Sequence, residues 1–219
     1  MCLIVFAWRT VANHPLIVAA NRDEFHGRPA TPAAFWADQP SILAGRDLEA
    51  KGTWMGVARS GRFAAVTNYR GGTEPRAAES RGALVTRFLE GNETPETYLK
   101  KIRTDQYSGF NLLVCDGEDF WSMSNRDGPP RRLQPGIYGL GNTLLEAPEV
   151  TDPKARFTAE LGPAIEPLFG VLAKSKIVNE RYGTRCSTIC FISNNKKIRY
   201  AERAFSPDGA DQETVHYEF

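Results

Sequence analysis

A cysteine occupies the second position of the chain, where removal of the initiator methionine makes it the N-terminal residue. A thiol there carries its own base, because an α-amino group has a reference pKa near 7.7 to 8.0 and is partly unprotonated at neutral pH. Cysteine is small enough to permit methionine removal, so the sequence predicts a mature protein that begins at Cys2. The alternative is a buried structural thiol at the start of an apolar strand.

A run of four polar residues, Asn21-Arg22-Asp23-Glu24, follows the second of two apolar segments, residues 2–8 and 16–20. The two segments predict a hairpin, which returns the polar run to the level of Cys2. The Arg22 guanidinium beside the thiol would lower its pKa, and Asp23 would hold the α-amine or Arg22 by charge-assisted hydrogen bonds. The alternative is a solvated strand end with a local ion pair, which contributes little to stability.

The histidines and the other cysteines lack the spacing that catalysis or metal binding requires. The three histidines, His14, His26 and His216, show neither metal-ligand nor triad spacing, so no metal site is predicted. The three other cysteines have no CxxC pair, and they lie in or directly before predicted strands. We therefore expect Cys115, Cys186 and Cys190 to be reduced, buried and inert.

The elements that must position Cys2 come in runs. After the first hairpin, an Ala/Pro-rich connection over residues 28–40 leads to a second hairpin, 54–58 with 62–68. Two helices follow, one capped by Ser80 and ending before Gly91, the other capped by Thr94 with Pro95 at its first position. The remaining predicted elements are strands at 110–115, 120–124 and 136–140, helices at 152–161 and 163–173, and strands at 187–192, 198–204 and 214–219.

Strands and helices therefore do not alternate one for one. Such an order is typical of antiparallel sheets with helices on their outer faces, which is the α+β class. A four-layer α-β-β-α sandwich of two antiparallel sheets is the most economical way to cover two sheets with two helical pairs. With 219 residues and no linker or repeat, the sequence predicts a single domain over residues 1–219.

The composition excludes several function classes. Lys plus Arg is 27 and Asp plus Glu is 26, a formal net charge of +1, and no block of like charge is present to follow a nucleic-acid backbone. The longest apolar run, residues 2–8, is too short to span a membrane and is not followed by a signal-peptide cleavage site. We expect a cytoplasmic protein without stable membrane insertion, and the sequence leaves its oligomeric state open.

Six segments distributed along the whole chain carry a resemblance to a known family. They are Met1-Cys2-Leu3-Ile4, Asn21-Arg22-Asp23-Glu24, Gly52-Thr53-Trp54-Met55-Gly56-Val57, Val66-Thr67-Asn68-Tyr69-Arg70, Gly139-Leu140-Gly141-Asn142 and Tyr182-Gly183-Thr184-Arg185. On these segments the sequence resembles the NRDE-motif family, which includes the transport and Golgi organisation type two proteins. The family is similar to N-terminal-nucleophile (Ntn) hydrolases of the bile-salt hydrolase and penicillin V acylase group, and this implies the same α-β-β-α sandwich.

The resemblance also implies roles for individual residues. Cys2 matches the nucleophile of those acylases, and Arg22 and Asp23 match an Arg/Asp pair beside it. Asn68 matches a residue whose backbone helps to form an oxyanion hole, and Asn142 matches its side-chain donor.

Arg185 matches a second active-site arginine. The sequence departs from the pattern in one respect, since Arg22 and Asp23 are adjacent whereas those acylases separate the two residue types by three positions. This spacing predicts that one of the two side chains is displaced from the thiol.

Two functions follow from the resemblance. The first is an N-terminal-Cys hydrolase that cleaves amide or thioester bonds in a small acylated compound through a covalent acyl-Cys intermediate, with no required cofactor. The second is a non-catalytic binding or trafficking protein for haem or an acyl-lipid ligand, in which haem would be a transported ligand held by the Cys2 thiolate.

Overall fold

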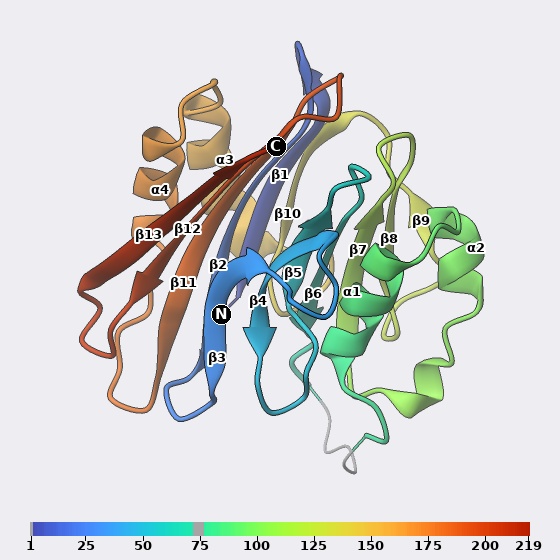
Figure 1. The fold of residues 1–219 in the computed structure, drawn as a ribbon, viewed down its shortest axis with the longest axis horizontal. Coiled ribbons are helices and arrows are strands. Elements are labelled where there is room, and N and C mark those ends of the chain that lie inside the picture. The colour runs from blue at the N-terminus through green and yellow to red at the C-terminus, as the bar shows by residue number, and fades with distance from the viewer. Residues whose placement is uncertain (1, 72–76) are drawn as a thin grey trace. The chain divides into compact units, whose positions relative to one another are not determined.

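The computed structural model describes residues 2–71 and 77–219, which form two compact units (Figure 1). The terminal unit combines the described part of residues 1–28 with 135–141 and 145–219. The central unit combines the described part of residues 29–134 with 142–144. Each unit is built on one antiparallel sheet.

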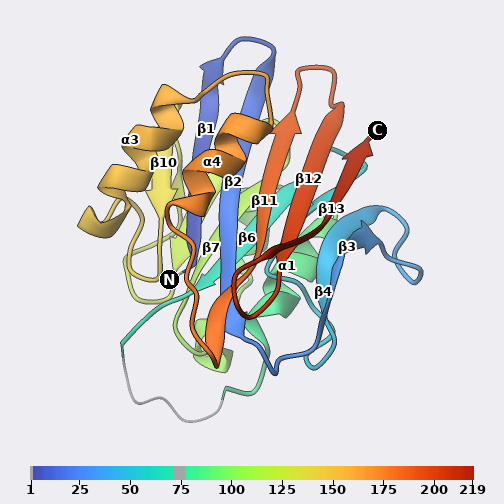
Figure 2. The ribbon, with the colours of Figure 1, turned by 90° about the vertical axis from the view of Figure 1, so that its left-hand side faces the viewer.

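The terminal unit contains a six-stranded sheet. In spatial order its strands are β10 (Gly136–Leu140), β1 (Leu3–Val11), β2 (His14–Phe25), β11 (Tyr182–Ile192), β12 (Ile198–Phe205) and β13 (Asp211–Glu218). Two helices, α3 (Thr151–Ala159) and α4 (Glu166–Ala173), lie over one face of this sheet (Figure 2). Alternate residues of each strand therefore point toward the helices.

The helix-facing positions of the terminal unit form a continuous apolar core. Leu3, Val5 and Ala7 of β1 contribute to it, and Phe157 of α3 and Leu172 of α4 pack against them fully buried. The pattern is the one expected for a sheet covered by amphipathic helices.

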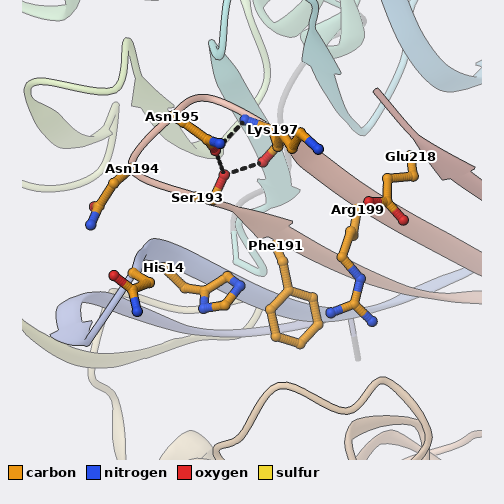
Figure 3. A pocket seen from close by; sticks show the side chains of 9 residues that line it. His14, Phe191, Ser193, Asn194, Asn195, Lys197, Arg199 and Glu218 are labelled. Carbon is orange, nitrogen blue, oxygen red and sulfur yellow. Dashed lines mark hydrogen bonds between the residues drawn. The ribbon is translucent and has the colours of Figure 1, made fainter.

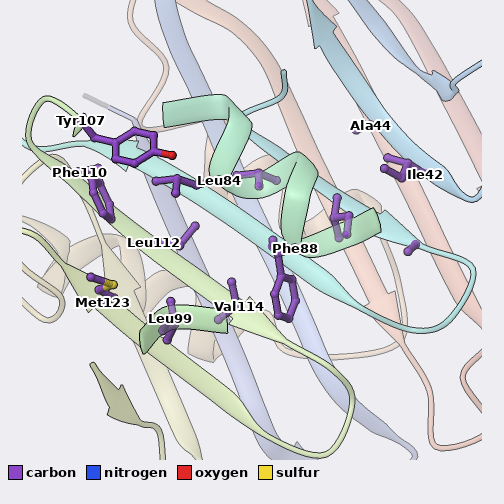
Figure 4. Close-up of a cluster of buried hydrophobic side chains, with 14 of the residues drawn as sticks. Ile42, Ala44, Leu84, Phe88, Leu99, Tyr107, Phe110, Leu112, Val114 and Met123 are labelled. Atoms are coloured by element: carbon purple, nitrogen blue, oxygen red, sulfur yellow. The ribbon is translucent and has the colours of Figure 1, made fainter. Parts of the chain in front are cut away.

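The central unit contains a seven-stranded sheet. Its strands, in spatial as well as chain order, are β3 (Ala30–Phe35), β4 (Ile42–Asp47), β5 (Met55–Ala58), β6 (Phe63–Asn68), β7 (Phe110–Cys115), β8 (Phe120–Ser124) and β9 (Arg131–Arg132). Helix α1 (Arg81–Glu90) packs on β5, β6 and β7, and α2 (Pro95–Lys100) packs on β8. Leu84 and Phe88 of α1 meet Leu112 and Val114 of β7 in the core of this unit (Figure 4).

The caps of these two helices are those that the sequence predicts. The Ser80 hydroxyl accepts a hydrogen bond from the Gly82 N–H, and the Thr94 hydroxyl accepts one from the Thr97 N–H. Helix α1 begins against residue 52, where a Cβ atom on Gly52 would lie 2.6 Å from the Gly82 carbonyl carbon. Glycine at that position permits the close approach.

The α+β class and its two antiparallel sheets, each with a pair of helices, are confirmed. The Ala/Pro-rich segment contains β3 and leads into β4, however, so six strands of the described residues precede the first helix rather than the predicted four. Pro32 is tolerated because β3 is an edge strand with a register shift between Thr31 and Ala34.

Other element boundaries also differ from the prediction. β11 begins five residues earlier than residue 187, α4 begins at Glu166 rather than Pro163, and the two-residue strand β9 was not predicted. Short 3₁₀ turns occupy Thr104–Gln106 and Pro148–Val150. Within residues 2–71 and 77–219, no helix is long and apolar enough to cross a membrane.

Candidate functional site

Cys2 lies directly before β1 and is half-buried. Leu3 pairs with Asn21, so the thiol lies beside the end of β2 that carries Arg22 and Asp23. Its Sγ atom is 3.4 Å from both the main-chain nitrogen and the main-chain oxygen of Asp23. The thiol thus donates to the Asp23 carbonyl and accepts from the Asp23 N–H.

The surroundings of Cys2 favour the protonated thiol. Desolvation by the surrounding protein is the main cause that raises the pKa of Cys2 above its ordinary value of 9.0, and the negative charge of Asp23 adds to it. The Asp23 N–H and the positive charge of Arg22 act in the opposite direction with smaller effect. A separate base is therefore needed to form the thiolate near neutral pH.

The side chains of Arg22 and Asp23 diverge, because successive residues of a strand point to opposite faces. The Asp23 carboxylate is buried and accepts a hydrogen bond of 2.6 Å from the Thr184 hydroxyl. That hydroxyl also accepts a 2.8 Å hydrogen bond from the Ile177 N–H. Arg22 is also buried, lies opposite Cys186 of β11, and its Nη2 is 4.0 Å from a Glu24 carboxylate oxygen.

Asp23 therefore contacts the thiol through its main chain, while Thr184 binds its carboxylate. The register of β11 against β2 shifts between Thr184 and Cys186. Sequence reasoning assigned no role to Thr184, although it stands inside the matched segment Tyr182-Gly183-Thr184-Arg185.

Arg185 anchors the loop that follows β2. Its Nη1 donates to the main-chain oxygens of Phe25, His26 and Arg28 at 3.0, 3.1 and 3.2 Å. Burial and the positive charge of Arg22 lower the pKa of Arg185 from its ordinary value. One side of this guanidinium is thus committed to holding the backbone at residues 25–28.

A buried polar pair, Thr188 and Glu202, lies on the same sheet face as Arg22 and was not predicted from the sequence. The Thr188 hydroxyl donates to the Glu202 carboxylate at 3.1 Å, and Thr188 pairs with Glu202 across β11 and β12. Burial, followed by the charge of Glu202, raises the pKa of Cys186 well above its ordinary value. Glu202 itself could have indicated this pair, because it is a charged residue on the same face of its strand as the apolar residues Ile198 and Tyr200.

Asn68 and Asn142 both lie in the central unit, where the structure brings them together. The buried Asn142 side chain donates through Nδ2 to the Asn68 main-chain oxygen at 2.8 Å. Asn111 of β7 supports the arrangement, because its Nδ2 donates to the Thr143 oxygen at 2.7 Å and to the Thr67 hydroxyl at 3.1 Å. Asn111 was not predicted, since an asparagine inside an apolar strand has no distinctive spacing. Of the six predicted site residues, Cys2, Arg22, Asp23 and Arg185 belong to the terminal unit.

Three solved structures illustrate the similarity of the fold to known proteins. An N-acylethanolamine-hydrolyzing acid amidase ortholog from Caenorhabditis elegans aligns with 86% of this chain and 92% of its own (TM-score 0.53, 12% identity). Penicillin V acylase from Agrobacterium tumefaciens aligns with 100% of this chain and 86% of its own, with a TM-score of 0.56 and 12% identity. The mutant C2A conjugated bile acid hydrolase from Clostridium perfringens aligns with 100% of this chain and 97% of its own, with a TM-score of 0.58 and 9% identity. The Ntn-hydrolase fold implied by the resemblance is confirmed.

Sequence relatives give a closer relationship. The Transport and Golgi organization protein 2 homolog of Homo sapiens is 36% identical over 272 aligned positions, which cover 100% of this chain and 99% of the relative. The homolog of Mus musculus is 34% identical with the same coverage. A sequence profile of the family "Transport and Golgi organisation 2" matches residues 1–166. The chain therefore belongs to the Transport and Golgi organisation 2 family.

Proposed function

We propose that the protein is an N-terminal-Cys hydrolase that cleaves an amide or thioester bond in a small acylated compound. The observation that carries the proposal is the position of Cys2 Sγ, 3.4 Å from the Asp23 N–H nitrogen and 3.4 Å from the Asp23 carbonyl oxygen. A thiol held between a donor and an acceptor keeps one fixed orientation. An oriented thiol is the first requirement for attack on a carbonyl carbon.

The proposal requires removal of Met1, which lies outside the described residues. Removal leaves the α-amine on the same residue as the thiol, where it takes the proton from Sγ directly or through a water. The raised pKa of Cys2 makes this base necessary, because little thiolate exists without it. The Asp23 N–H and the charge of Arg22 then stabilise the thiolate as it forms.

The reaction proceeds in two steps. Sγ attacks the carbonyl carbon, a C–S bond to the enzyme forms, and the bond to the amine or thiol leaving group breaks while the α-ammonium returns the proton to that group. Water then attacks the acyl-Cys intermediate and releases the carboxylic acid, regenerating Cys2. Two proteins of similar fold are named as an acid amidase and an acylase, which supports acyl compounds as the substrate class.

The test compares Cys2→Ser and Cys2→Ala with Cys190→Ala, a change at a fully buried cysteine in the same sheet. Turnover of amide, ester and thioester substrates is measured together with the intact mass of each protein. Serine is almost never ionised near neutral pH, so Cys2→Ser should lose roughly a thousandfold or more in turnover. Cys190→Ala should keep the wild-type rate. Turnover that survives in Cys2→Ala would refute Cys2 as the nucleophile.

A further inference from the structure

A pocket with a volume of about 460 Å³ lies in the terminal unit, at the end of β2 that is distant from Cys2 (Figure 3). His14 lines it and is the first residue of β2, whereas Asp23, which contacts Cys2, comes nine residues later. At about 3.3 Å per strand residue, the two sites are separated by about 30 Å. The volume is in the range of small-molecule sites.

The rim of this pocket consists of two turns that are bonded to each other. The Asn194 N–H donates to the Asn13 main-chain oxygen at 3.1 Å and so joins the β11–β12 turn to the β1–β2 turn. Within the first of these turns, the Ser193 hydroxyl donates to the Lys197 main-chain oxygen at 2.9 Å and also bonds the Asn195 side chain (Figure 3). The rim is therefore preorganised, which reduces the entropy that binding must overcome.

The pocket carries an excess of positive charge. Lys197 and Arg199 line it together with one carboxylate, Glu218. Glu218 lies opposite Arg199 in the register of β12 and β13, so the two cations outnumber the one carboxylate of the lining. Arg199 is held by a 2.9 Å hydrogen bond from its Nη1 to the Pro163 main-chain oxygen, whereas Lys197 is exposed. Two cations near one cavity attract an anion.

Planar groups also line the pocket. The His14 ring meets the Phe191 ring edge-on, with 5.5 Å between centroids, and the Arg199 guanidinium carbon is 5.2 Å from the centre of the Phe191 ring. Phe191 is buried beneath them, whereas His14 and Arg199 are only half-buried. Imidazole and guanidinium planes stack well on flat rings.

We propose that this pocket binds a small organic anion, a carboxylate or phosphate group attached to a planar ring. Lys197 and Arg199 contact the anionic oxygens, and His14 lies against the ring. The site is separate from the Cys2 centre, so the proposal does not depend on the proposed hydrolase activity.

Calorimetric titration of the full chain with phenyl phosphate and with benzoate tests the proposal. At least one of the two should bind with a stoichiometry of one, and inorganic phosphate and phenol should each bind at least about tenfold more weakly than the better probe, which corresponds to about 1.4 kcal/mol. Lys197→Gln and Arg199→Gln should each weaken binding by about tenfold or more. Cys2→Ser should leave the affinity unchanged.

Lys196→Gln is the matched control, because Lys196 lies in the same turn and carries the same charge but does not line the pocket. The affinity of Lys196→Gln for the better of the two probes should stay within about twofold of the wild-type affinity. Lys197 is exposed, so Lys197→Gln keeps the test valid even if Arg199→Gln fails to fold. The absence of saturable binding by both ring anions would overturn the proposal, as would equal losses in Lys196→Gln and Lys197→Gln.

Discussion

The hydrogen bond from Thr184 to Asp23 should be essential for the backbone that holds Cys2. Thr184 is 2% exposed and Asp23 is 4% exposed, and Thr184 Oγ1 lies 2.6 Å from the carboxylate. Thr184→Val keeps the shape of the side chain and removes only the hydroxyl. The Asp23 carboxylate then loses this donor, and the Ile177 N–H loses its 2.8 Å acceptor.

The two lost hydrogen bonds determine how much the unfolding free energy should fall. A hydrogen bond to a charged group contributes about 1.5 to 3 kcal/mol and a neutral one about 0.5 to 1.5, so Thr184→Val should lower the unfolding free energy by about 2 to 4 kcal/mol. Thr184→Ser keeps the hydroxyl and should recover most of this loss. Thr158→Val, an exposed change on α3, should shift the unfolding free energy by less than about 0.5 kcal/mol.

Urea denaturation followed by far-UV circular dichroism measures these differences. The rate of Cys2 alkylation by iodoacetamide, followed by peptide mass spectrometry, reports separately on the position of the Asp23 backbone. Thr184→Val should change that rate, whereas Thr158→Val should not. A loss in Thr184→Val no larger than in Thr158→Val would refute the reasoning that the Thr184–Asp23 bond supports the site.

Three further outcomes are expected. Arg62→Met should lower the unfolding free energy by about 2 to 4 kcal/mol in urea titrations, because the buried guanidinium donates to the Phe88 and Glu93 main-chain oxygens, each at 2.9 Å. The unfolding free energy should fall as pH rises above 9. The reason is that Cys186 in the unfolded chain loses its proton near its ordinary pKa of 9.0, while burial keeps the folded thiol protonated. Cys186→Ala should therefore flatten the dependence of the unfolding free energy on pH, measured by denaturation at several pH values. Cys2→Ser should leave any haem affinity within about tenfold of wild type in spectroscopic titration, because the proposed hydrolase does not use Cys2 as a haem ligand; a much larger loss would favour the haem-carrier alternative.

Helices α1 and α2 were predictable because their ends carry local signals. Ser80 and Thr94 cap α1 and α2 as expected, and both side-chain bonds are local. Strand β3 was missed because Pro32 and its alanines hide the alternation that identifies a strand. Strand β4 was missed because its apolar run, Ile42 to Ala44, is short and is followed by Gly45. The early start of β11 was missed because Gly183 is poor in strand propensity, and only pairing with β2 makes that segment extended.

The site was predictable only where chain connectivity determines it. A short hairpin brings Cys2 next to residues 22 and 23, and the sequence is sufficient to place them there. The partner of the Asp23 carboxylate is Thr184, which lies 161 positions away, and no local pattern identifies such a contact. The same holds for Asn111, whose bond to the 142–144 segment depends on the tertiary fold.

The discontinuity of the terminal unit has a consequence for synthesis on the ribosome. β2 pairs with β11, so the strand that flanks Cys2 keeps an open hydrogen-bonding edge until residues 182–192 leave the exit tunnel. The intervening central unit is continuous apart from its short 142–144 segment and is complete in the nascent chain before then. Pairing across such a sequence separation is slow, and an open apolar edge is prone to aggregation. Nascent chains arrested or truncated before β11 should therefore depend on chaperones far more than the finished protein.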